Sequence, residues 1–532
     1  MIVLAVQIGH NSSVCLYDNK KLIYYNQEER LSKLKKDGGI PFLCLEEIKK
    51  IYPKIDIALC TGYDATYTTP LVYYALLRLN LIKKNDKVYY LYYSHHLMHA
   101  AKAYFSSGFK NATIIVVDGR GSIYPLSNMC SGYETTSVYS IQYPNEFNAI
   151  FKKIYSKNYL QNKVDVIFEH DALSISKDTV FEITSKYDLG HFYSSISNYF
   201  KWKDEEGKLM GLSAYGKSNK DIKKLISKKD FLIDLNINNK YKITNKKDLA
   251  FEAQNYFEEN YFNLVNRFKD LNKNIIITGG TGLNVVNNFK IKKYFKNNNI
   301  YIDPLCGDEG NSIGACQYFL YKQYNNDDFE KVNSLYLGPV YNFNIKKNIK
   351  KSSLNEVCDL LVDNKIVALY QNKAEAGPRA LGNRSLLMNP CTINGKDIMN
   401  SVKGREYFRP LACCVLEEHA EEWFDLKYSP DMMYAVTAKE KTKKIVPSIV
   451  HEDNTCRIQT INKNQNKNLY NLLNLFYKKT KVPILMNTSF NLKGEPIVET
   501  PEDAVSVIKK SKINYLYFSE VEKLYKCKNK YD

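Results

Sequence analysis

Three of the eight histidines lie within five residues of one another, in the segment SHHLMHA at positions 94–100. His95 and His99 are four residues apart, so on a helix both imidazoles lie on the same face, one turn apart. The β-branched run ATIIVV that follows predicts a strand buried on both faces, and Asp118 comes directly after it. Two imidazoles and a carboxylate suit zinc, iron or manganese. The alternative is a pair of buried helix histidines beside an ordinary turn aspartate.

A second carboxylate, Asp308, lies in the glycine-flanked loop PLCGDEGNSIGAC at 304–316, directly before a predicted helix of small residues. It is a candidate fourth ligand, and the alternative is that it caps the helix. Upstream, IIITGGTGLNVVNN at 275–288 predicts a strand, a Gly-Gly turn and a helix. Glycines at such a turn let the backbone approach a ligand, and the helix N-terminus favours anions.

Arginine is scarce, with nine residues among 75 basic ones, and five of the nine lie between 379 and 457. Where lysine is the usual cation, a retained arginine suggests that its planar fork is needed. Such a group suits phosphate or carboxylate recognition, and structural ion pairs are the alternative. The five are Arg379, Arg384, Arg405, Arg409 and Arg457.

The pattern of apolar runs predicts an α/β protein of two or three domains. The first 30 residues predict three strands, an opening that resembles the ribonuclease-H-like fold of actin and sugar kinases. Residues 130–185 are polar with weak periodicity and are interpreted as an insertion or substrate-facing flap, and lysine-rich 216–250 as surface helices. The irregular segment 325–345 predicts a boundary, after which a second α/β unit begins. The sequence shows no internal repeat.

The net charge of +18 would suit a nucleic-acid or other polyanionic partner. The alternative is coding bias, since a chain rich in lysine, asparagine, isoleucine and tyrosine is typical of AT-rich DNA. Twelve cysteines without repeated C-x-x-C spacing predict reduced thiols of a cytoplasmic protein. The apolar stretch PLVYYALLRLNLI is short and carries Arg78, so no membrane span is expected, and no signal peptide is expected at the N-terminus.

Ten motifs in order along residues 1 to about 510 resemble the O-carbamoyltransferase family of nodulation-factor and antibiotic-tailoring enzymes. They are IGHNSS, EERLSKLK, HHLMHA, VVDGRG, EGKLMGLSAYGK, GGTGLN, GDEGNSIGA, EAGPRALGNRS, KGREYFRP and NTSFNLKGEPIV. The resemblance implies a ribonuclease-H-like ASKHA domain for carbamoyl transfer at 1–335 and a YrdC-like α/β domain for carbamoyl phosphate and ATP at 345–532. Asn11 stands where the family often has an aspartate.

The resemblance also implies an activity in two stages. In the YrdC-like domain, carbamoyl phosphate and ATP, with magnesium, would form a carbamoyl adenylate. In the first domain a metal, ferrous iron or a manganese or zinc substitute, would help transfer the carbamoyl group to an acceptor hydroxyl. The metal would polarise the carbamoyl carbonyl as a Lewis acid.

Residues at the matching positions take the family's roles as expectations. His10 is the expected catalytic base, since an imidazole accepts protons near neutral pH. The expected metal ligands are His95, His99, Asp118 and Asp308. His96 faces away from the first pair and is expected either to support the ligands from behind or to be structural. The expected adenylate-binding residues are Lys35, Gly211, Gly280 and Asn284. The expected carbamoyl-phosphate and ATP ligands are Arg379, Ala380, Arg384, Lys403, Arg409, Arg457, Asn487 and Ser489. Arg405 and Glu406 are left out, as a pair that would satisfy each other.

Two other functions stay open at this point: an ASKHA-type sugar kinase and a nucleotide-binding scaffold without catalysis. The acceptor is not determined by the sequence. A small molecule, a glycan, a nucleotide or a hydroxymethylated base in DNA would each offer a hydroxyl, and the positive charge favours an anionic one. A homodimer is a further hypothesis that the sequence does not test.

Overall fold

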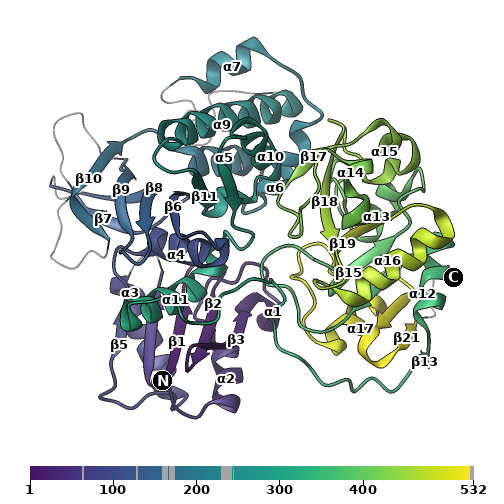
Figure 1. Cartoon of the computed structure of the whole chain (residues 1–532), viewed down its shortest axis with the longest axis horizontal. Helices are drawn as coiled ribbons and strands as arrows, with labels where there is room; N and C mark the ends of the chain where they lie inside the picture. The colour runs from purple at the N-terminus through teal and green to yellow at the C-terminus, as the bar shows by residue number, and fades with distance from the viewer. Residues whose placement is uncertain are drawn as a thin grey trace. The chain divides into compact units, whose positions relative to one another are not determined.

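The computed structural model describes residues 1–62, 65–127, 130–157, 166, 174–228, 243 and 245–527. The chain divides into two compact units, each with its own sheets and helices (Figure 1). Unit 1 consists of Met1–Ser32 and Lys36–Asn333, and unit 2 of Lys33–Lys35 and Ser334–Asp532. The expected functional roles of the two units stay predictions.

The first sheet of unit 1 has the strand order β3-β2-β1-β4-β5. Its strands are β1 (Ile2–Gln7), β2 (Ser13–Asp18), β3 (Lys21–Gln27), β4 (Ile57–Thr61) and β5 (Val88–Tyr90). The pairs β1–β2 and β2–β3 are antiparallel, whereas β1–β4 and β4–β5 are parallel. The central strand β1 is buried from Val3 onward, as expected for an apolar run covered on both faces.

The second sheet of unit 1 has the order β10-β9-β8-β6-β11-β12, with β7 added beside β8. Its strands are β6 (Asn111–Val117), β7 (Ile123–Pro125), β8 (Ser131–Gln142), β9 (Asn148–Tyr155), β10 (Ile175–Thr184), β11 (Asn274–Thr278) and β12 (Asn299–Ile302). Here β6–β8 and β8–β9 are antiparallel, and β6–β11 and β11–β12 are parallel. The five strands β9-β8-β6-β11-β12 therefore repeat the order and orientation of the first sheet, a repeat that the sequence does not show.

Two helices lie side by side between these sheets: α4 (His95–Ser107) and α11 (Asn311–Tyr324) (Figure 1). Helix α4 packs on β6, β8 and β11, and α11 packs on β1, β2 and β4. They approach so closely at Gly314 that an added Cβ would lie 2.1 Å from the carbonyl oxygen of Met98. Because both faces of α4 are covered, every residue from His95 to Phe105 is buried.

The remaining helices in the described part of unit 1 are α1 (Glu28–Ser32), α2 (Phe42–Ile51), α3 (Ala65–Arg78), α5 (Leu189–Tyr199), α6 (Glu206–Ser213), α7 (Lys220–Ile226), α9 (Lys246–Phe268) and α10 (Val285–Tyr294), with 3₁₀ turns η1 (Gly280–Leu283) and η2 (Asp308–Gly310). Among them, α5, α6 and α7 pack against α9. Among the described ranges, no helix has the length and apolar character needed to cross a membrane.

Unit 2 is built on a nine-stranded mixed sheet of order β13-β21-β20-β14-β15-β19-β16-β18-β17. The strands are β13 (Ile349–Lys351), β14 (Val367–Tyr370), β15 (Arg384–Met388), β16 (Ala412–Leu416), β17 (Ala435–Thr437), β18 (Thr455–Ile461), β19 (Ile484–Ser489), β20 (Tyr515–Phe518) and β21 (Lys523–Lys526). The helices are α12 (Leu354–Val362), α13 (Gly395–Val402), α14 (Ala420–Trp423), α15 (Glu440–Ile445), α16 (Lys467–Thr480) and α17 (Pro501–Lys510), with η3 (Glu417–His419), η4 (Pro447–Ile449) and η5 (Ser519–Val521). The mixed α/β fold expected from the sequence is confirmed for both units.

The prediction of a flap at 130–185 is wrong for the described part of that segment. It forms β8, β9 and β10, which follow β6 in the sheet in that order: β8 pairs with β6, β9 with β8 and β10 with β9. The strands are hard to see in the sequence because β8 buries Glu134, Thr135, Thr136 and Ser137 where apolar residues are usual. Residues 158–165 and 167–173, which the same prediction covered, lie outside the described residues, as do 229–242 and 244 of the predicted surface helices.

Candidate metal centre and anion-binding cluster

Helix α4 carries the two histidines that the sequence placed on one face. The rings of His95 and His99 are 4.9 Å apart between centroids, and both side chains are buried. A polar ring buried in this way requires a hydrogen-bonding or ionic partner. The partners are the carboxylates of Asp118, directly after β6, and Asp308, at the start of η2.

The four side chains converge on one point. The Nε2 atom of His95 lies 3.3 Å from Asp118 Oδ2 and 3.4 Å from Asp308 Oδ1. The Nε2 atom of His99 lies 3.7 Å from the same Asp118 oxygen and 3.3 Å from the same Asp308 oxygen. The two Nε2 atoms are 3.3 Å apart. Ligands held about 2.1 Å from a tetrahedral ion are roughly 3.4 Å from one another, so these separations suit a single bound cation.

Main-chain groups hold the Asp118 carboxylate in this orientation. Its Oδ1 accepts hydrogen bonds from the amides of Gly119, at 2.8 Å, and Gly280, at 3.2 Å, which leaves Oδ2 for the two imidazoles. The approach of Gly280 depends on Gly279, whose φ of 88° lies in the left-handed region and whose added Cβ would lie 2.4 Å from the Val117 carbonyl oxygen. The Gly-Gly turn therefore helps to fix the position of the Asp118 carboxylate.

Charge explains why these buried groups tolerate one another. Burial opposes protonation of His95, but the carboxylates of Asp308 and Asp118 outweigh it and raise the pKa of His95 to about 10. Burial would raise the pKa of Asp118, yet its hydrogen bonds with His95 and His99 hold that pKa well below the ordinary range. With both imidazoles protonated, the charges of His95 and His99 balance the two carboxylates. A divalent cation between neutral imidazoles would balance them equally, and its binding would release the two imidazole protons.

The donor set therefore fits a metal ion on three grounds: separation, charge and chemistry. Two nitrogens and two oxygens suit iron, manganese or zinc, and the geometry does not choose among them. His95, His99, Asp118 and Asp308 form this cluster in the described residues. Their role as metal ligands is a proposal.

The expected base, His10, lies in the turn between β1 and β2. Its Nε2 is 3.7 Å from Asp204 Oδ1, and both side chains are partly exposed. The neighbouring Asn11 donates a hydrogen bond of 2.9 Å to Glu309, the residue next to Asp308. This bond ties the His10 turn to η2, so the asparagine that replaces the family's aspartate has a structural partner.

The four expected adenylate-binding residues do not all lie in the same unit. Gly280 touches the cluster as described, Gly211 is buried in α6, and Asn284 caps α10 by accepting a hydrogen bond from the Asn287 amide. The Asn284 side chain also exchanges hydrogen bonds of 3.1 Å with Gln254. Lys35 groups with unit 2 rather than with unit 1. The adenylate-binding role of these residues stays a prediction.

In unit 2, strand register brings Arg457 and Asn487 to the same row of the sheet. Arg457 on β18 pairs with Ala412 on β16, and Ala412 pairs on its other side with Asn487 on β19. Residues directly paired across strands project from the same face. Between them lies Ala412, which is buried, and Asn487 donates a hydrogen bond of 3.5 Å to the Ala380 carbonyl.

Three more arginines surround Arg457. Burial and the positive charges of Arg379, Arg405 and Arg409 lower the pKa of Arg457 well below its ordinary value. Its buried Nε–H has no hydrogen-bond acceptor among the described residues. Convergent cations and a buried donor without an acceptor are the features of an anion site.

The sequence interpretation left Arg405 and Glu406 out of the site, as residues that could pair with each other. The Arg405 guanidinium donates hydrogen bonds of 3.4 Å to Thr488 and to Ser489, which brings it beside predicted site residues, and Glu406 lies 3.4 Å from Lys493. The signal that would have found Arg405 is its place in KGREYFRP, between Lys403 and Arg409.

Arg384 differs from the other four arginines. Its guanidinium is fully buried, lies 3.6 Å from the centre of the Tyr370 ring, and donates to main-chain carbonyls. The acceptors are Gln371, Asn372, Asn383 and Glu499. This is a structural arrangement, and the expected phosphate-binding role of Arg384 stays a prediction.

Lys403 is buried beside the end of β19. Its ammonium donates to the main-chain and side-chain oxygens of Ser489 and, at 2.9 Å, to Asn491 Oδ1. Burial, followed by the charge of Arg405, lowers the pKa of Lys403 well below its ordinary value. The structure thus brings together Lys403 and Ser489, two of the predicted site residues. Asn491 is a further partner that the sequence did not indicate.

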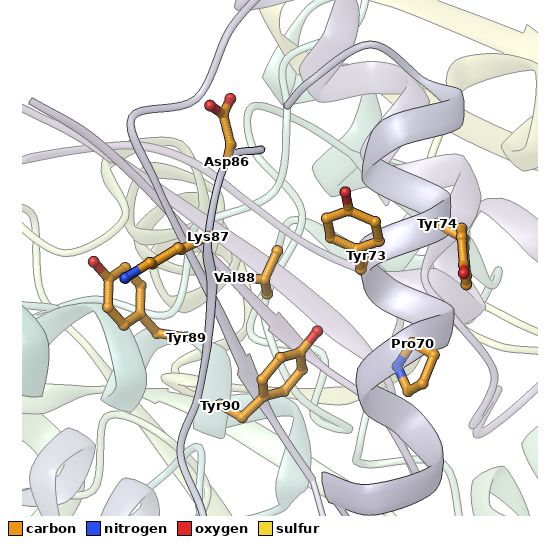
Figure 2. A pocket seen from close by; sticks show the side chains of 8 residues that line it. All are labelled: Pro70, Tyr73, Tyr74, Asp86, Lys87, Val88, Tyr89 and Tyr90. Carbon is orange, nitrogen blue, oxygen red and sulfur yellow. The ribbon is translucent and has the colours of Figure 1, made fainter. Parts of the chain in front are cut away.

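A separate hollow of about 340 Å³ lies on unit 1, between α3 and the edge strand β5 (Figure 2). Tyr73 and Tyr74 of α3 and Tyr89 and Tyr90 of β5, labelled in Figure 2, contribute to its lining. It is lined by Pro70, Tyr73, Tyr74, Asp86, Lys87, Val88, Tyr89 and Tyr90. None of the residues predicted for the site lines this hollow.

The fold and these two clusters define a class: a two-unit α/β enzyme with a candidate metal centre in one unit and a candidate anion site in the other. The chain matches the family profile described as carbamoyltransferase N-terminus over residues 48–263 and 224–317. It matches the profile described as carbamoyltransferase C-terminus over residues 358–523. The chain belongs to the carbamoyltransferase family and is a carbamoyltransferase, as the resemblance in its motifs indicated.

Relatives cover nearly the whole chain. The uncharacterized protein MJ1051 of Methanocaldococcus jannaschii is 28% identical over 97% of this chain and 98% of its own. Nodulation protein NolNO of Sinorhizobium fredii is 27% identical over 93% of this chain and 76% of its own. Nodulation protein U of Bradyrhizobium diazoefficiens is 34% identical over 42% of this chain and 39% of its own.

Among solved structures, full-length HypF in its phosphate- and nucleotide-bound form is 11% identical, with a TM-score of 0.37 over 62% of this chain and 56% of that one. HypF of T. kodakarensis is 13% identical, with a TM-score of 0.38 over 62% of this chain and 49% of that one. Scores of this size do not bear on function.

Proposed function

We propose that the chain is an O-carbamoyltransferase that works in two half-reactions, one in each unit. In unit 2, water would hydrolyse carbamoyl phosphate to carbamate and phosphate. The carbamate would then attack the α-phosphorus of ATP, giving carbamoyl adenylate and pyrophosphate. In unit 1, an acceptor hydroxyl would attack the carbamoyl carbon, giving the O-carbamoyl product and AMP.

The observation that carries the first half-reaction is the arginine cluster around Arg457. Both substrates of that step bear phosphate, and Arg379, Arg405 and Arg409 direct positive charge at the same place. The buried Nε–H without an acceptor would be satisfied by a phosphate oxygen, a charge-assisted hydrogen bond stronger than a neutral one. Asn487, in the same row of the sheet, would add a neutral donor or acceptor beside it.

The second half-reaction is supported by the four-residue cluster of unit 1. A metal held by His95, His99, Asp118 and Asp308 would supply Lewis-acid polarisation of the carbamoyl carbonyl. Iron is the metal that the family resemblance implies, and the donor set is compatible with it. Gly280, whose amide touches Asp118, would let the backbone lie close to the adenylate.

His10 would accept the proton of the acceptor hydroxyl as it attacks. Its side chain is partly exposed, so a substrate can reach it, and its turn is joined to η2 through Asn11 and Glu309. Asp204, 3.7 Å from Nε2, would stabilise the imidazolium that forms. A proton held there could be released to solvent after product leaves.

For the acceptor, we propose an anionic, hydroxyl-bearing molecule: a sugar nucleotide, an acidic glycan or a hydroxymethylated base in DNA. The net charge of +18 supports this class. Turnover on such acceptors would fall as salt rises, because screening weakens attraction between exposed charges. Turnover that is independent of salt would exclude a polyanionic acceptor.

The experiment is pyrophosphate release from ATP by the full chain loaded with ferrous iron, with and without carbamoyl phosphate. Release that depends on carbamoyl phosphate and needs no acceptor would establish the first half-reaction. ADP formed on addition of sugars would instead indicate a kinase, and no turnover of either kind would indicate a binding scaffold. A screen of hydroxyl acceptors by mass spectrometry would then look for the gain of one carbamoyl group.

Two variants separate the half-reactions. Arg409→Ala should abolish pyrophosphate release and leave the metal content unchanged. His10→Ala should release pyrophosphate as the wild type does but transfer no carbamoyl group. Equal loss of pyrophosphate release in both variants would contradict the two-site scheme.

A further inference from the structure

Helix α4 carries a third polar residue, Lys102, on the face that holds His95 and His99. Lys102 is three residues after His99 and seven after His95, so all three lie along one face of the helix. Its side chain is buried, and its ammonium is paired with the buried carboxylate of Asp303. An ion pair is thus enclosed about one turn from the cluster.

Asp303 connects α4 to the segment that carries Asp308. Its Oδ2 accepts a hydrogen bond of 3.0 Å from the Thr278 hydroxyl at the end of β11, and its Oδ1 accepts one of 3.2 Å from the Leu305 amide. The Asp303 amide donates to the Ile277 carbonyl at 2.9 Å. The pair Lys102–Asp303 therefore joins the helix of the histidines, the end of β11 and the loop that leads into Asp308.

A second buried ion pair lies at the other end of α4. Lys152 on β9 donates a hydrogen bond of 2.7 Å to Glu134 Oε2 on β8, and both side chains are fully buried. Lys152 also donates to Ser137 at 3.2 Å and to Tyr139 at 3.1 Å, so three oxygens surround its ammonium. With these bonds the Glu134 carboxylate has a fixed position.

The other oxygen of the Glu134 carboxylate binds the start of α4. Glu134 Oε1 accepts hydrogen bonds from the His96 amide at 3.2 Å and the Ser122 amide at 3.1 Å. A carboxylate at a helix N-terminus also satisfies orphan amides and interacts favourably with the helix dipole. The segment from Asp118 to Ser122 is further tied to β8 by the bonds Asp118 N–H to Thr135 and Gly121 N–H to Glu134, of 2.9 and 2.8 Å.

Each ion pair thus links the histidine helix to one of the two carboxylate ligands. Buried ion pairs contribute little net stability, and apolar replacements are often tolerated, so stability alone does not explain two of them beside one cluster. What they add is fixed orientation, because Asp303, Glu134 and Lys152 also form hydrogen bonds with the segments around them.

We propose that Glu134–Lys152 and Lys102–Asp303 are positioning pairs for the metal centre. The first sets Asp118 against the two histidines, and the second sets Asp308 against them. Neither pair touches the metal, and both act through the ligands. The inference rests on the proposed metal-binding role of the cluster.

Cobalt(II) is a suitable probe because its visible spectrum reports coordination geometry and its titration gives an affinity. The matched variants are Glu134→Met/Lys152→Met and Lys102→Met/Asp303→Asn, which remove both charges of a pair and leave no buried charge alone. The control is Glu146→Met/Lys322→Met, which removes a partly exposed ion pair of unit 1 between α11 and the turn before β9.

We expect each positioning variant to bind cobalt(II) about 10- to 100-fold more weakly than the wild type, with an altered visible spectrum. The control variant should match the wild type in both. Thermal unfolding and circular dichroism of the metal-free proteins would identify any variant that has lost its fold, and in that case Glu134→Gln/Lys152→Gln and Lys102→Gln/Asp303→Asn, which remove both charges and keep acceptor oxygens, take its place.

If the positioning variants fold and bind cobalt(II) with the affinity and spectrum of the wild type, the inference is overturned. The proposed metal-binding role of the cluster would then still stand. Wild-type protein that binds no cobalt(II) would overturn the metal centre itself, and the inference with it. Equal weakening in the control would also overturn the inference, since any lost ion pair of unit 1 would then act alike.

Discussion

Replacing Arg457 by methionine should change stability and phosphate binding in opposite directions. Arg457 lies among Arg379, Arg405 and Arg409, and its buried Nε–H has no acceptor in the described part of the chain. Without an anion, the cluster therefore holds mutual repulsion and an unsatisfied donor. Methionine is of similar length, removes the charge and leaves no buried polar group.

The magnitude follows from these two features. A buried polar group left without a partner costs about 1–3 kcal/mol, so Arg457→Met should unfold with a free energy about 1 kcal/mol higher than the wild type when phosphate is absent. A hydrogen bond to a charged group contributes about 1.5–3 kcal/mol, so the same variant should bind phosphate roughly 10- to 150-fold more weakly.

The assay is thermal unfolding of the full chain over a series of phosphate and pyrophosphate concentrations at constant ionic strength. An anion at 100 times its dissociation constant would stabilise the wild type by about 2.7 kcal/mol. Without the anion, the variant should have a higher Tm than the wild type, and adding the anion should raise its Tm less. Plots of Tm against anion concentration for the two proteins should therefore cross. Calorimetric titration of pyrophosphate would give the affinities directly.

Arg384→Met is the matched control because the same side chain is replaced on the same sheet. Its guanidinium donates to four main-chain carbonyls, so the variant should lose about 3 kcal/mol or more with or without phosphate. The reasoning is refuted if Arg457→Met melts lower than the wild type without the anion and gains as much from phosphate. That result would make Arg457 a structural arginine like Arg384.

Three further outcomes are expected in unit 1. Asp308→Asn should retain no tightly bound metal after dialysis, with an affinity for cobalt(II) lower by about 100-fold or more, and unchanged metal content would contradict the proposed ligand set. Burial and the charge of Arg120 lower the pKa of His191 to about 4. Because an unfolded histidine titrates near 6.5, the unfolded state binds more protons between these values, so this contribution is complete above about pH 6.5 and is lost, by up to about 3 kcal/mol, as pH falls to about 4. Denaturant unfolding at pH 7 and pH 4.5 should show a smaller difference for His191→Gln than for the wild type, and equal differences would refute the assignment. Gly314→Ala should cost about 2–3 kcal/mol in the same assay, since its Cβ would lie 2.1 Å from a carbonyl oxygen of α4, whereas Gly207→Ala, with no atom within 4 Å, should cost nothing.

The candidate metal site was predictable in part because its elements are local. The spacing of His95 and His99 places both on one helix face, and an apolar run ending at Asp118 predicts a carboxylate at a strand end. Asp308 is 190 residues farther along the chain than Asp118, and its glycine-flanked loop made it a candidate ligand with a helix cap as the alternative. The structure then brought its carboxylate to 3.3 Å from His99.

Other features were not predictable because they depend on partners distant in the sequence. Strand β8 was mistaken for a flap since its buried Glu134 and Ser137 read as surface residues, and only Lys152 on the next strand explains their burial. Arg405 and Arg384 have the same chemistry and similar surroundings in the sequence. Tertiary packing separates them: Arg405, in the loop after α13, donates to Thr488, whereas Arg384, on β15, donates to carbonyl groups.

By itself the sequence determined the α/β character of both units, the family, the paired histidines and the scarcity of arginine that drew attention to unit 2. The tertiary structure decided which arginines converge, which buried charges are paired and how the second five-strand arrangement repeats the first. The physical reason is the separation along the chain of the residues that interact. Periodicity and spacing follow from backbone geometry over a few residues, whereas register, helix packing and buried ion pairs join groups whose separation along the chain carries no signal of their contact.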